Sequence, residues 1–93
     1  MDLLSEDAIE RQLAEVPGWT RSGDAITTTV QRKDFAAAML YAAAVGHFAE
    51  AAGHHPDIKI EWNKVTLTLS THSAGGLTEA DFNLARRIGT LIA

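Results

Sequence analysis

The fold is decided by residues 58–69, which read IKIEWNKVTLTL. Apolar and polar side chains alternate there, which is the pattern of strands that bury one face. The expected inward-facing residues are Ile58, Ile60 and Trp62 in the first strand and Val65, Leu67 and Leu69 in the second. Asn63 and Lys64 between the strands suit a two-residue turn. The stretch therefore predicts a β-hairpin in which Trp62 belongs to the core.

An earlier hairpin and a first helix are predicted on the N-terminal side. Residues 19–22 and 26–30 read as short strands, the second rich in β-branched side chains, and Gly23-Asp24 between them suits a turn. Ser5 can cap a helix that ends at Pro17-Gly18, because Ser accepts hydrogen bonds at helix starts and Pro-Gly interrupts helices.

Two more helices complete the predicted fold. One runs from Asp34 to about Ala52, and the last runs from Thr78 to Ile92, where Thr78 and Asp81 resemble a capping box. The predicted order is α-β-β-α-β-β-α. It gives a two-layer α+β fold, in which a four-stranded antiparallel sheet carries three helices on one face. We expect residues 1–93 to form a single domain, since chains of this length rarely build two cores.

The long helix carries two apolar stripes. The first consists of Phe35, Met39, Ala42, Gly46, Ala49 and Gly53, and the second of Tyr41, Val45, Phe48 and Ala52. Together they cover about half of the helix circumference, which is more than one contact with a sheet requires. The second stripe could meet another subunit or a partner protein, and a broad Ala-rich core helix explains it equally well.

Composition and charge argue against several classes of protein. The net charge is −4, and no basic cluster exceeds Arg32-Lys33 or Arg86-Arg87, which argues against direct nucleic-acid binding. The absence of cysteine excludes disulfides and thiolate metal sites. The apolar run 35–45 is short and Ala-rich for a membrane span, and the first residues lack the features of a signal peptide. We therefore expect a cytoplasmic protein without a membrane association.

Three histidines lie at loop junctions along one edge of the predicted sheet. His54 and His55 stand between the long helix and the third strand, and His72 follows the fourth strand. Because the hairpin turn joins these strands at their far end, the three imidazoles should converge. Acid–base chemistry, metal binding and a solvated or capping role all fit such a group. Metal binding is the weaker interpretation, because adjacent residues in extended chain point to opposite sides.

Other polar and aromatic residues near this edge have ordinary structural interpretations. Glu50 lies one helical turn before His54, at the border of the apolar arc, where a solvated helix charge is the alternative. Asp81 is favoured as a carboxylate at a helix start, and Trp19 as a core or lid residue. Because each site histidine sits at the end of an element, Ala substitutions there should cost about 1 kcal/mol or less.

The residues that carry these features resemble the signature of the pterin-4a-carbinolamine dehydratase family. The matching positions, separated by gaps of three, five, nine and eight residues, are Glu50, His54-His55-Pro56, Trp62, His72 and Asp81. Flanking segments agree too: Pro17-Gly18-Trp19, Lys33-Asp34-Phe35, Asn63-Lys64-Val65, Leu69-Ser70-Thr71-His72 and Gly75-Gly76-Leu77-Thr78. The resemblance covers nearly the whole chain.

The resemblance implies an enzyme, a hydro-lyase. Its substrate would be 4a-hydroxytetrahydropterin from aromatic amino acid hydroxylases, and its product quinonoid dihydropterin, with no metal or organic cofactor. The implied catalytic residues are His54, His55 and His72, the implied substrate-binding residues are Glu50, Pro56, Trp19, Thr71 and His72, and Trp62 and Asp81 are structural positions of the motif. The family also implies a homodimer or homotetramer, formed partly through sheet edges.

One position departs from the family, and two other functions stay open. The residue before the histidine pair is often Asp or Asn in the family and is Gly53 here, which still suits a helix C-terminus. Some similar domains act as scaffolds or assembly factors without catalysis. A regulator that binds a protein partner through the long helix is the other alternative. The intact histidine trio favours the enzyme, and neither alternative excludes catalysis.

Overall fold

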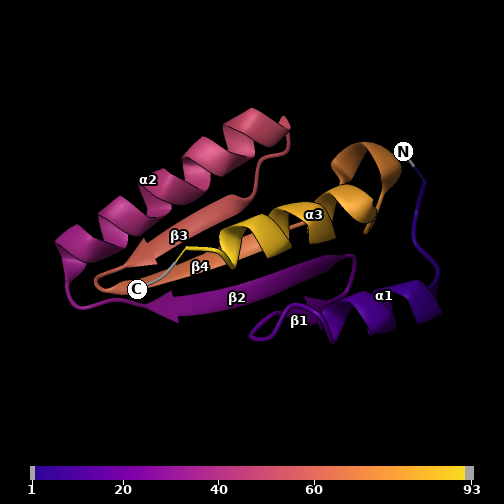
Figure 1. Cartoon of the computed structure of the whole chain (residues 1–93), viewed down its shortest axis with the longest axis horizontal. Coiled ribbons are helices and arrows are strands. Elements are labelled where there is room, and N and C mark those ends of the chain that lie inside the picture. Colours follow the sequence, from indigo (N-terminus) through magenta and orange to yellow (C-terminus); the bar gives the residue numbers. More distant parts are fainter. Residues whose placement is uncertain (1, 92–93) are drawn as a thin grey trace.

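The computed structural model describes residues 2–91 and contains the predicted element order, with one short 3₁₀ turn added (Figure 1). The helices are α1 (Glu6–Leu13), α2 (Phe35–Ala52) and α3 (Glu79–Ile88). The strands are β1 (Thr20–Ser22), β2 (Ala25–Gln31), β3 (Asp57–Glu61) and β4 (Lys64–Leu69), and the 3₁₀ turn is η1 (His72–Ala74). The last helix ends at Ile88, and the prediction for Ile92 lies outside the described residues.

The sheet is antiparallel throughout, with the strand order β1-β2-β4-β3. Pairing of Ile26 with Leu69 and of Val30 with Val65 places these side chains on one face, and α2 and α3 cover that face (Figure 1). The opposite face carries threonines, and the Thr29 and Thr66 hydroxyls lie 2.9 Å apart across two strands. The predicted two-layer α+β architecture is therefore confirmed.

The two apolar stripes of α2 are buried to different extents. The residues of α2 that are buried against the sheet and α3 are Ala38, Tyr41, Val45 and Ala49. Phe35 and Met39, which belong to the other stripe, are about half exposed. Of the two interpretations left open for the stripe that contains Tyr41 and Val45, the structure therefore supports the core helix. Almost every position of this helix is Ala or apolar, so periodicity gives little indication of which face is inward.

The turn of the second hairpin lies one residue earlier than predicted. Glu61 pairs with Lys64, so Trp62 and Asn63 form the turn, and Trp62 is 68% exposed with a left-handed φ of 51°. The prediction of Trp62 in the core was therefore wrong. The physical reason lies in Asn63, whose side-chain amide donates to the Arg32 carbonyl at 3.0 Å while its own carbonyl accepts from Arg32 N–H at 2.8 Å. These bonds hold Asn63 in the turn.

Polar side chains start the helices as the sequence predicts. The Ser5 hydroxyl accepts from Ala8 N–H, the Asp34 carboxylate accepts from Ala37 N–H, and Thr78 with Asp81 forms a complete capping box. Gly53 ends α2 with a left-handed φ of 65°, a conformation that glycine adopts without strain. This cap directs the chain from α2 into the histidine pair.

By length and composition, α2 could cross a membrane, contrary to the expectation drawn from residues 35–45 alone. A core helix passes the same test of length and apolar content. Tyr41, Val45 and Ala49 of α2 pack into the core that the sheet and α3 share. We therefore interpret α2 as the central core helix of this domain.

Candidate active site

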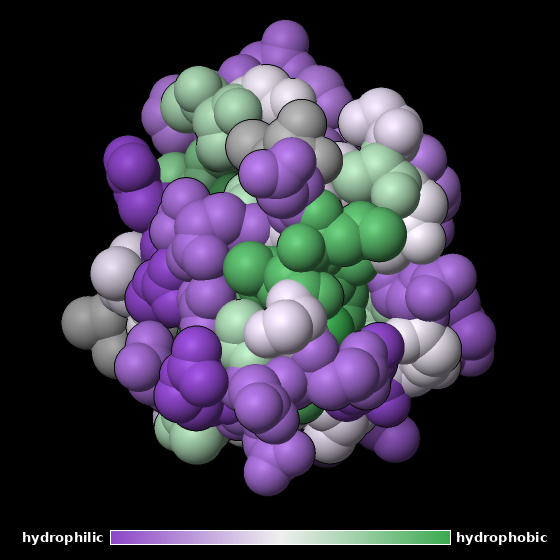
Figure 2. All heavy atoms as spheres, turned by 90° about the vertical axis from the view of Figure 1, so that its right-hand side faces the viewer, coloured by the Kyte–Doolittle hydropathy of each residue, from purple (hydrophilic) through white to green (hydrophobic). Residues whose placement is uncertain are grey.

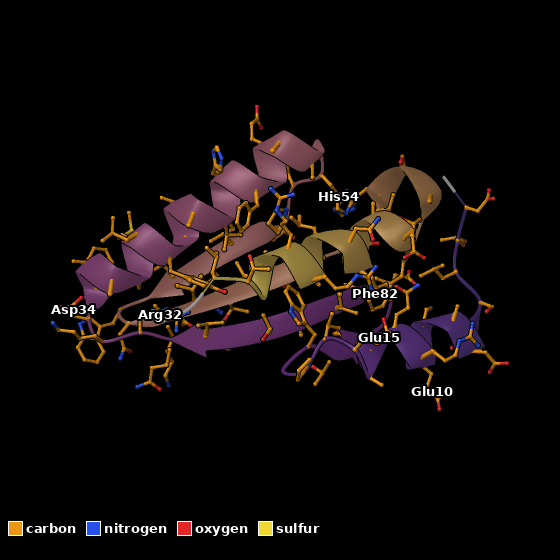
Figure 3. All side chains as sticks on the ribbon, viewed as in Figure 1. Glu10, Glu15, Arg32, Asp34, His54 and Phe82 are labelled. Carbon is orange, nitrogen blue, oxygen red and sulfur yellow. The ribbon has the colours of Figure 1, made fainter. Side chains whose placement is uncertain are left out.

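The predicted convergence of the histidines rests on the register of β3 with β4. Asp57 pairs with Thr68, so the residues just before β3 lie at the same end of the sheet as those just after β4. His54 lies between the end of α2 and the start of α3 (Figure 3). Figure 2 shows that end of the molecule, where hydrophilic side chains surround an apolar area. The structure therefore contains the predicted sheet edge, where β3 begins and β4 ends.

His54 is bound to a carboxylate that water does not reach. Its Nε2 lies 2.6 Å from Asp81 Oδ1, and the Asp81 side chain is fully buried. The His54 side chain is itself only 15% exposed. A buried carboxylate requires hydrogen-bond partners to offset its lost hydration. The imidazole of His54 is one of those partners.

The other oxygen of Asp81 is held by two donors. Oδ2 accepts from the backbone N–H of Thr78 and from the Thr71 hydroxyl, each at 2.9 Å. The Thr71 and Thr78 hydroxyl oxygens lie 2.8 Å apart. Because the Thr71 hydroxyl proton points to Asp81, the Thr78 hydroxyl donates to Thr71. Asp81 is thus fixed from the start of α3 and from the segment after β4.

His55 has a similar bond in a different environment. Its Nε2 lies 2.7 Å from Glu50 Oε1, but the side chains of His55 and Glu50 are 64% and 82% exposed. Water competes for an exposed pair, which therefore holds its geometry weakly. The two adjacent histidines thus differ: His54 is fixed by a buried carboxylate, and His55 is free to adapt. The sequence predicted Glu50 near the histidines, and in the structure Glu50 lies beside His55.

The remaining predicted site residues lie at different depths. His72 is exposed and begins η1, directly after Thr71. Thr71 is buried, and its hydroxyl faces Asp81 and Thr78 rather than solvent. Pro56 is partly buried between His55 and β3. Trp19 is 8% exposed and lines a groove with the second half of α3, whereas Asp81 stands in the first turn of α3.

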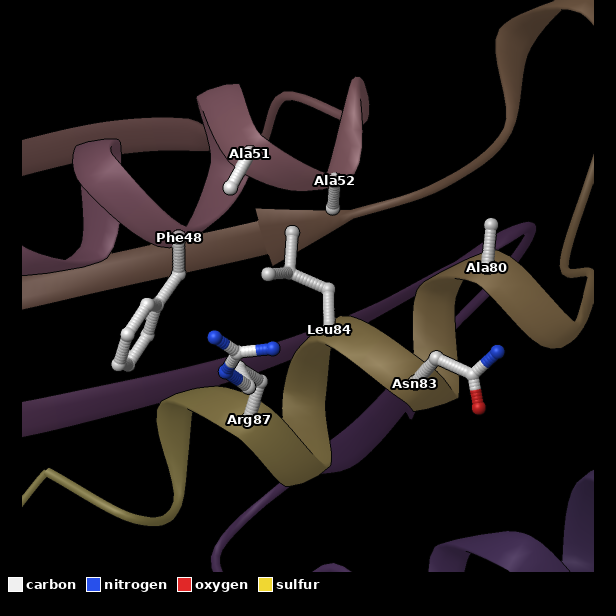
Figure 4. Close-up of a pocket in the computed structure, with 7 residues that line it drawn as sticks. All are labelled: Phe48, Ala51, Ala52, Ala80, Asn83, Leu84 and Arg87. Atoms are coloured by element: carbon white, nitrogen blue, oxygen red, sulfur yellow. The ribbon is translucent and has the colours of Figure 1, made fainter.

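A groove of about 310 Å³ separates α2 from α3 (Figure 4). It is lined by Phe48, Ala51, Ala52, Ala80, Asn83, Leu84 and Arg87. The Arg87 guanidinium lies 4.9 Å from the centroid of the Phe48 ring, a distance at which cation and ring attract. Ala80 precedes Asp81 in α3, yet the lining includes none of the three histidines. The histidines therefore identify the candidate site better than this cavity does.

The contact between His54 and Asp81 was not predicted from the sequence. Asp81 was identified as a helix-capping carboxylate and as a motif position, and that capping role is confirmed. The spacing of 27 residues to His54 carries no local signal of a contact. Only the shared seam between the end of α2 and the start of α3 brings the two side chains together.

Metal binding finds no support in the geometry of residues 2–91. Within that range, no three His, Asp or Glu side chains come together as a metal-binding group. His54 and His55 each direct Nε2 to a different carboxylate. The expectation of a metal-free site stays a prediction.

Comparisons with known proteins agree on one family. The sequence profile described as pterin 4 alpha carbinolamine dehydratase matches residues 2–91. A protein of Nocardia farcinica, provisionally named pterin-4-alpha-carbinolamine dehydratase, is 56% identical over 90 residues, covering 97% of this chain and 95% of that protein. A Roseiflexus castenholzii protein with the same provisional name is 52% identical and covers 97% of each chain.

Solved structures agree with the fold. A protein of Brucella melitensis, described as a transcriptional coactivator/pterin dehydratase, superposes with a TM-score of 0.88 at 35% identity, over 92% of this chain and 94% of that one. A pterin dehydratase-like protein, described as a RuBisCO assembly factor in the alpha-carboxysome, gives a TM-score of 0.60 at 21% identity, over 75% and 81%. The second similarity concerns the fold alone.

Proposed function

Because the chain belongs to the pterin-4a-carbinolamine dehydratase family, we propose that it removes water from a 4a-hydroxytetrahydropterin to give quinonoid dihydropterin. The activity would recycle the pterin used by an aromatic amino acid hydroxylase. One observation supports this most: two adjacent imidazoles each lie against a carboxylate, at the sheet edge that also carries His72. No cofactor is required, because the pterin is the substrate.

The reaction needs one proton donor and one proton acceptor. The N5 lone pair forms the C4a=N5 bond as the C4a–O bond breaks, the leaving hydroxyl takes a proton and departs as water, and N5 loses its proton. Imidazole can be donor or acceptor near neutral pH. We assign proton transfer to His54 and His55, and both substrate binding and proton transfer to His72.

We assign the remaining substrate contacts on the family resemblance and on what each side chain contacts. Glu50 orients His55 through the 2.7 Å bond. Pro56 and Thr71 flank the histidines in sequence, and we assign them to the pocket wall through their backbone and apolar atoms, since the Thr71 hydroxyl is engaged with Asp81. The assignment of Trp19 as an aromatic wall for the flat pterin ring rests on the family resemblance alone, because its side chain is 8% exposed and lies beside the second half of α3.

We further propose a cytoplasmic homodimer or homotetramer. β3 is an edge strand of the sheet, and Phe35, Met39 and Leu40 of α2 are 51%, 47% and 72% exposed. Edge strands and apolar surfaces of this kind are commonly covered by another chain. The exposed face of α2 also suits a protein partner. Sedimentation at micromolar concentration tests the assembly, and a species of 10.0 kDa would overturn it.

Stopped-flow measurement with chemically generated 4a-hydroxytetrahydropterin tests the proposed reaction. The wild type should accelerate dehydration, and His54→Ala and His55→Ala should each lose about 10²–10⁴ in rate, as usual for a proton-transfer group. His72→Ala should also raise KM. His47→Ala is the control, because His47 lies on the exposed side of α2. If all three site variants stay within twofold of the wild type, a non-catalytic scaffold replaces the enzyme.

A further inference from the structure

The hydrogen bonds of Asp81 determine which donor each of its two carboxylate oxygens faces. Backbone N–H of Thr78 can only donate, so Asp81 Oδ2 must accept from it. The Thr71 hydroxyl donates to the same oxygen. Oδ1 is the oxygen that faces His54, at 2.6 Å from Nε2. A carboxylate with this set of partners requires the hydrogen of His54 to sit on Nε2.

We propose that Asp81, fixed by Thr71 and Thr78, is a positioning residue that holds His54 in the Nε2–H tautomer and leaves its Nδ1 lone pair for the substrate. The proposal rests on the proposed function for the role of His54 in proton transfer. A buried carboxylate that fixes the tautomer and orientation of a reacting imidazole is known to affect catalysis strongly. Asp81 itself does not touch the substrate.

The second histidine provides a contrast within the same chain. His55 also lies against a carboxylate, but Glu50 is 82% exposed, and water can replace it. Asp81 is fully buried, so its partners cannot be exchanged for water without opening the start of α3. A fixed tautomer is therefore expected at His54 and not at His55.

Asp81→Asn replaces the acceptor that faces His54 with a donor and keeps the acceptor that caps α3. The amide oxygen must face the Thr78 N–H, since that group cannot accept, and the amide NH₂ must then face His54. Nε2 would have to accept, so the hydrogen of His54 moves to Nδ1. The expected result is a fall in kcat of about 10²–10⁴-fold with little change in KM.

The tautomer can be measured without any turnover, by NMR of ¹⁵N-labelled histidine in the full chain. The wild type should show His54 protonated at Nε2, and Asp81→Asn should show it protonated at Nδ1. Asp34→Asn is the matched control, because Asp34 caps α2 through Ala37 N–H, as Asp81 caps α3. It should leave the tautomer and kcat within twofold of the wild type.

The outcomes separate the two proposals. A wild-type His54 protonated at Nδ1 overturns the positioning role directly, even if Asp81→Asn does not fold. A folded Asp81→Asn protein that keeps both Nε2–H and its kcat also overturns it. If the tautomer reverses and kcat stays within twofold, the positioning role stands and the assignment of His54 to proton transfer in the proposed function fails.

Discussion

Replacing His54 with Ala should destabilise the fold more than replacing His55. The first substitution leaves Asp81 Oδ1, on a fully buried side chain, without its imidazole partner. The second removes a bond between side chains that are 64% and 82% exposed. The two substitutions delete the same atoms from adjacent positions, so the comparison isolates the burial of the carboxylate.

The burial of the two carboxylates sets the expected difference in the free energy of unfolding between the two variants. An unsatisfied buried acceptor costs about 1–3 kcal/mol, and an exposed ion pair contributes about 0–1 kcal/mol. Because the His54 side chain is 15% exposed, water can enter beside Asp81 and bring the cost of His54→Ala to about 1–2 kcal/mol. For a domain of this length that lowers Tm by about 4–16 °C. This revises the sequence-based expectation, which gave all three histidines the same small cost.

Urea unfolding followed by circular dichroism, at fixed protein concentration, measures both variants against the wild type. His54→Gln should recover part of the loss, because its amide can donate to Asp81. Equal unfolding midpoints for His54→Ala and His55→Ala would refute the reasoning, as would a destabilised His55→Ala beside an unchanged His54→Ala.

Three other measurements test separate features. Trp62→Asn should raise the free energy of unfolding by about 0.5–1 kcal/mol, because Asn adopts the left-handed φ more readily than Trp; a lower urea midpoint would contradict this. Burial raises the pKa of Tyr41, and the positive charge of Arg32 opposes the rise only partly. Its contribution to stability is therefore full below about pH 10 and lost as pH rises through the raised pKa, and Tyr41→Phe should reduce this alkaline loss in unfolding at about pH 8 and pH 11. Dialysis against a chelator should leave the dehydration rate unchanged, and loss of activity restored by zinc would contradict the metal-free site.

The elements of the fold could be predicted because each has a local signal. The alternation around the second hairpin, the Ser5 and Thr78 caps and the Gly53 terminator all act within a few residues. The turn was misplaced by one residue because its position depends on Arg32, about thirty residues away in the chain. The face of α2 that packs into the core stayed open for a related reason, since its Ala-rich circumference leaves the choice of face to tertiary packing.

The candidate site, like the fold, could be predicted from the sequence only in part. The expectation that the histidines share one end of the sheet follows from hairpin topology and needs no long-range information. The different environments of His54 and His55 depend on which carboxylate each imidazole meets, and Asp81 comes from the other side of the α2–α3 seam. Sequence spacing could identify Asp81 as a cap but not as a partner of His54.

Asp81 thus links the stability of α3 to the geometry of His54. Its Oδ2 completes the capping box, and its Oδ1 meets the imidazole. A substitution that removes both oxygens, such as Asp81→Ala, would lower stability and activity together and could not distinguish the two roles. Asp81→Asn keeps the acceptor for Thr78 N–H while reversing the contact with His54. A large fall in kcat with a small change in the free energy of unfolding is therefore the result expected if the carboxylate serves the reaction as well as the helix.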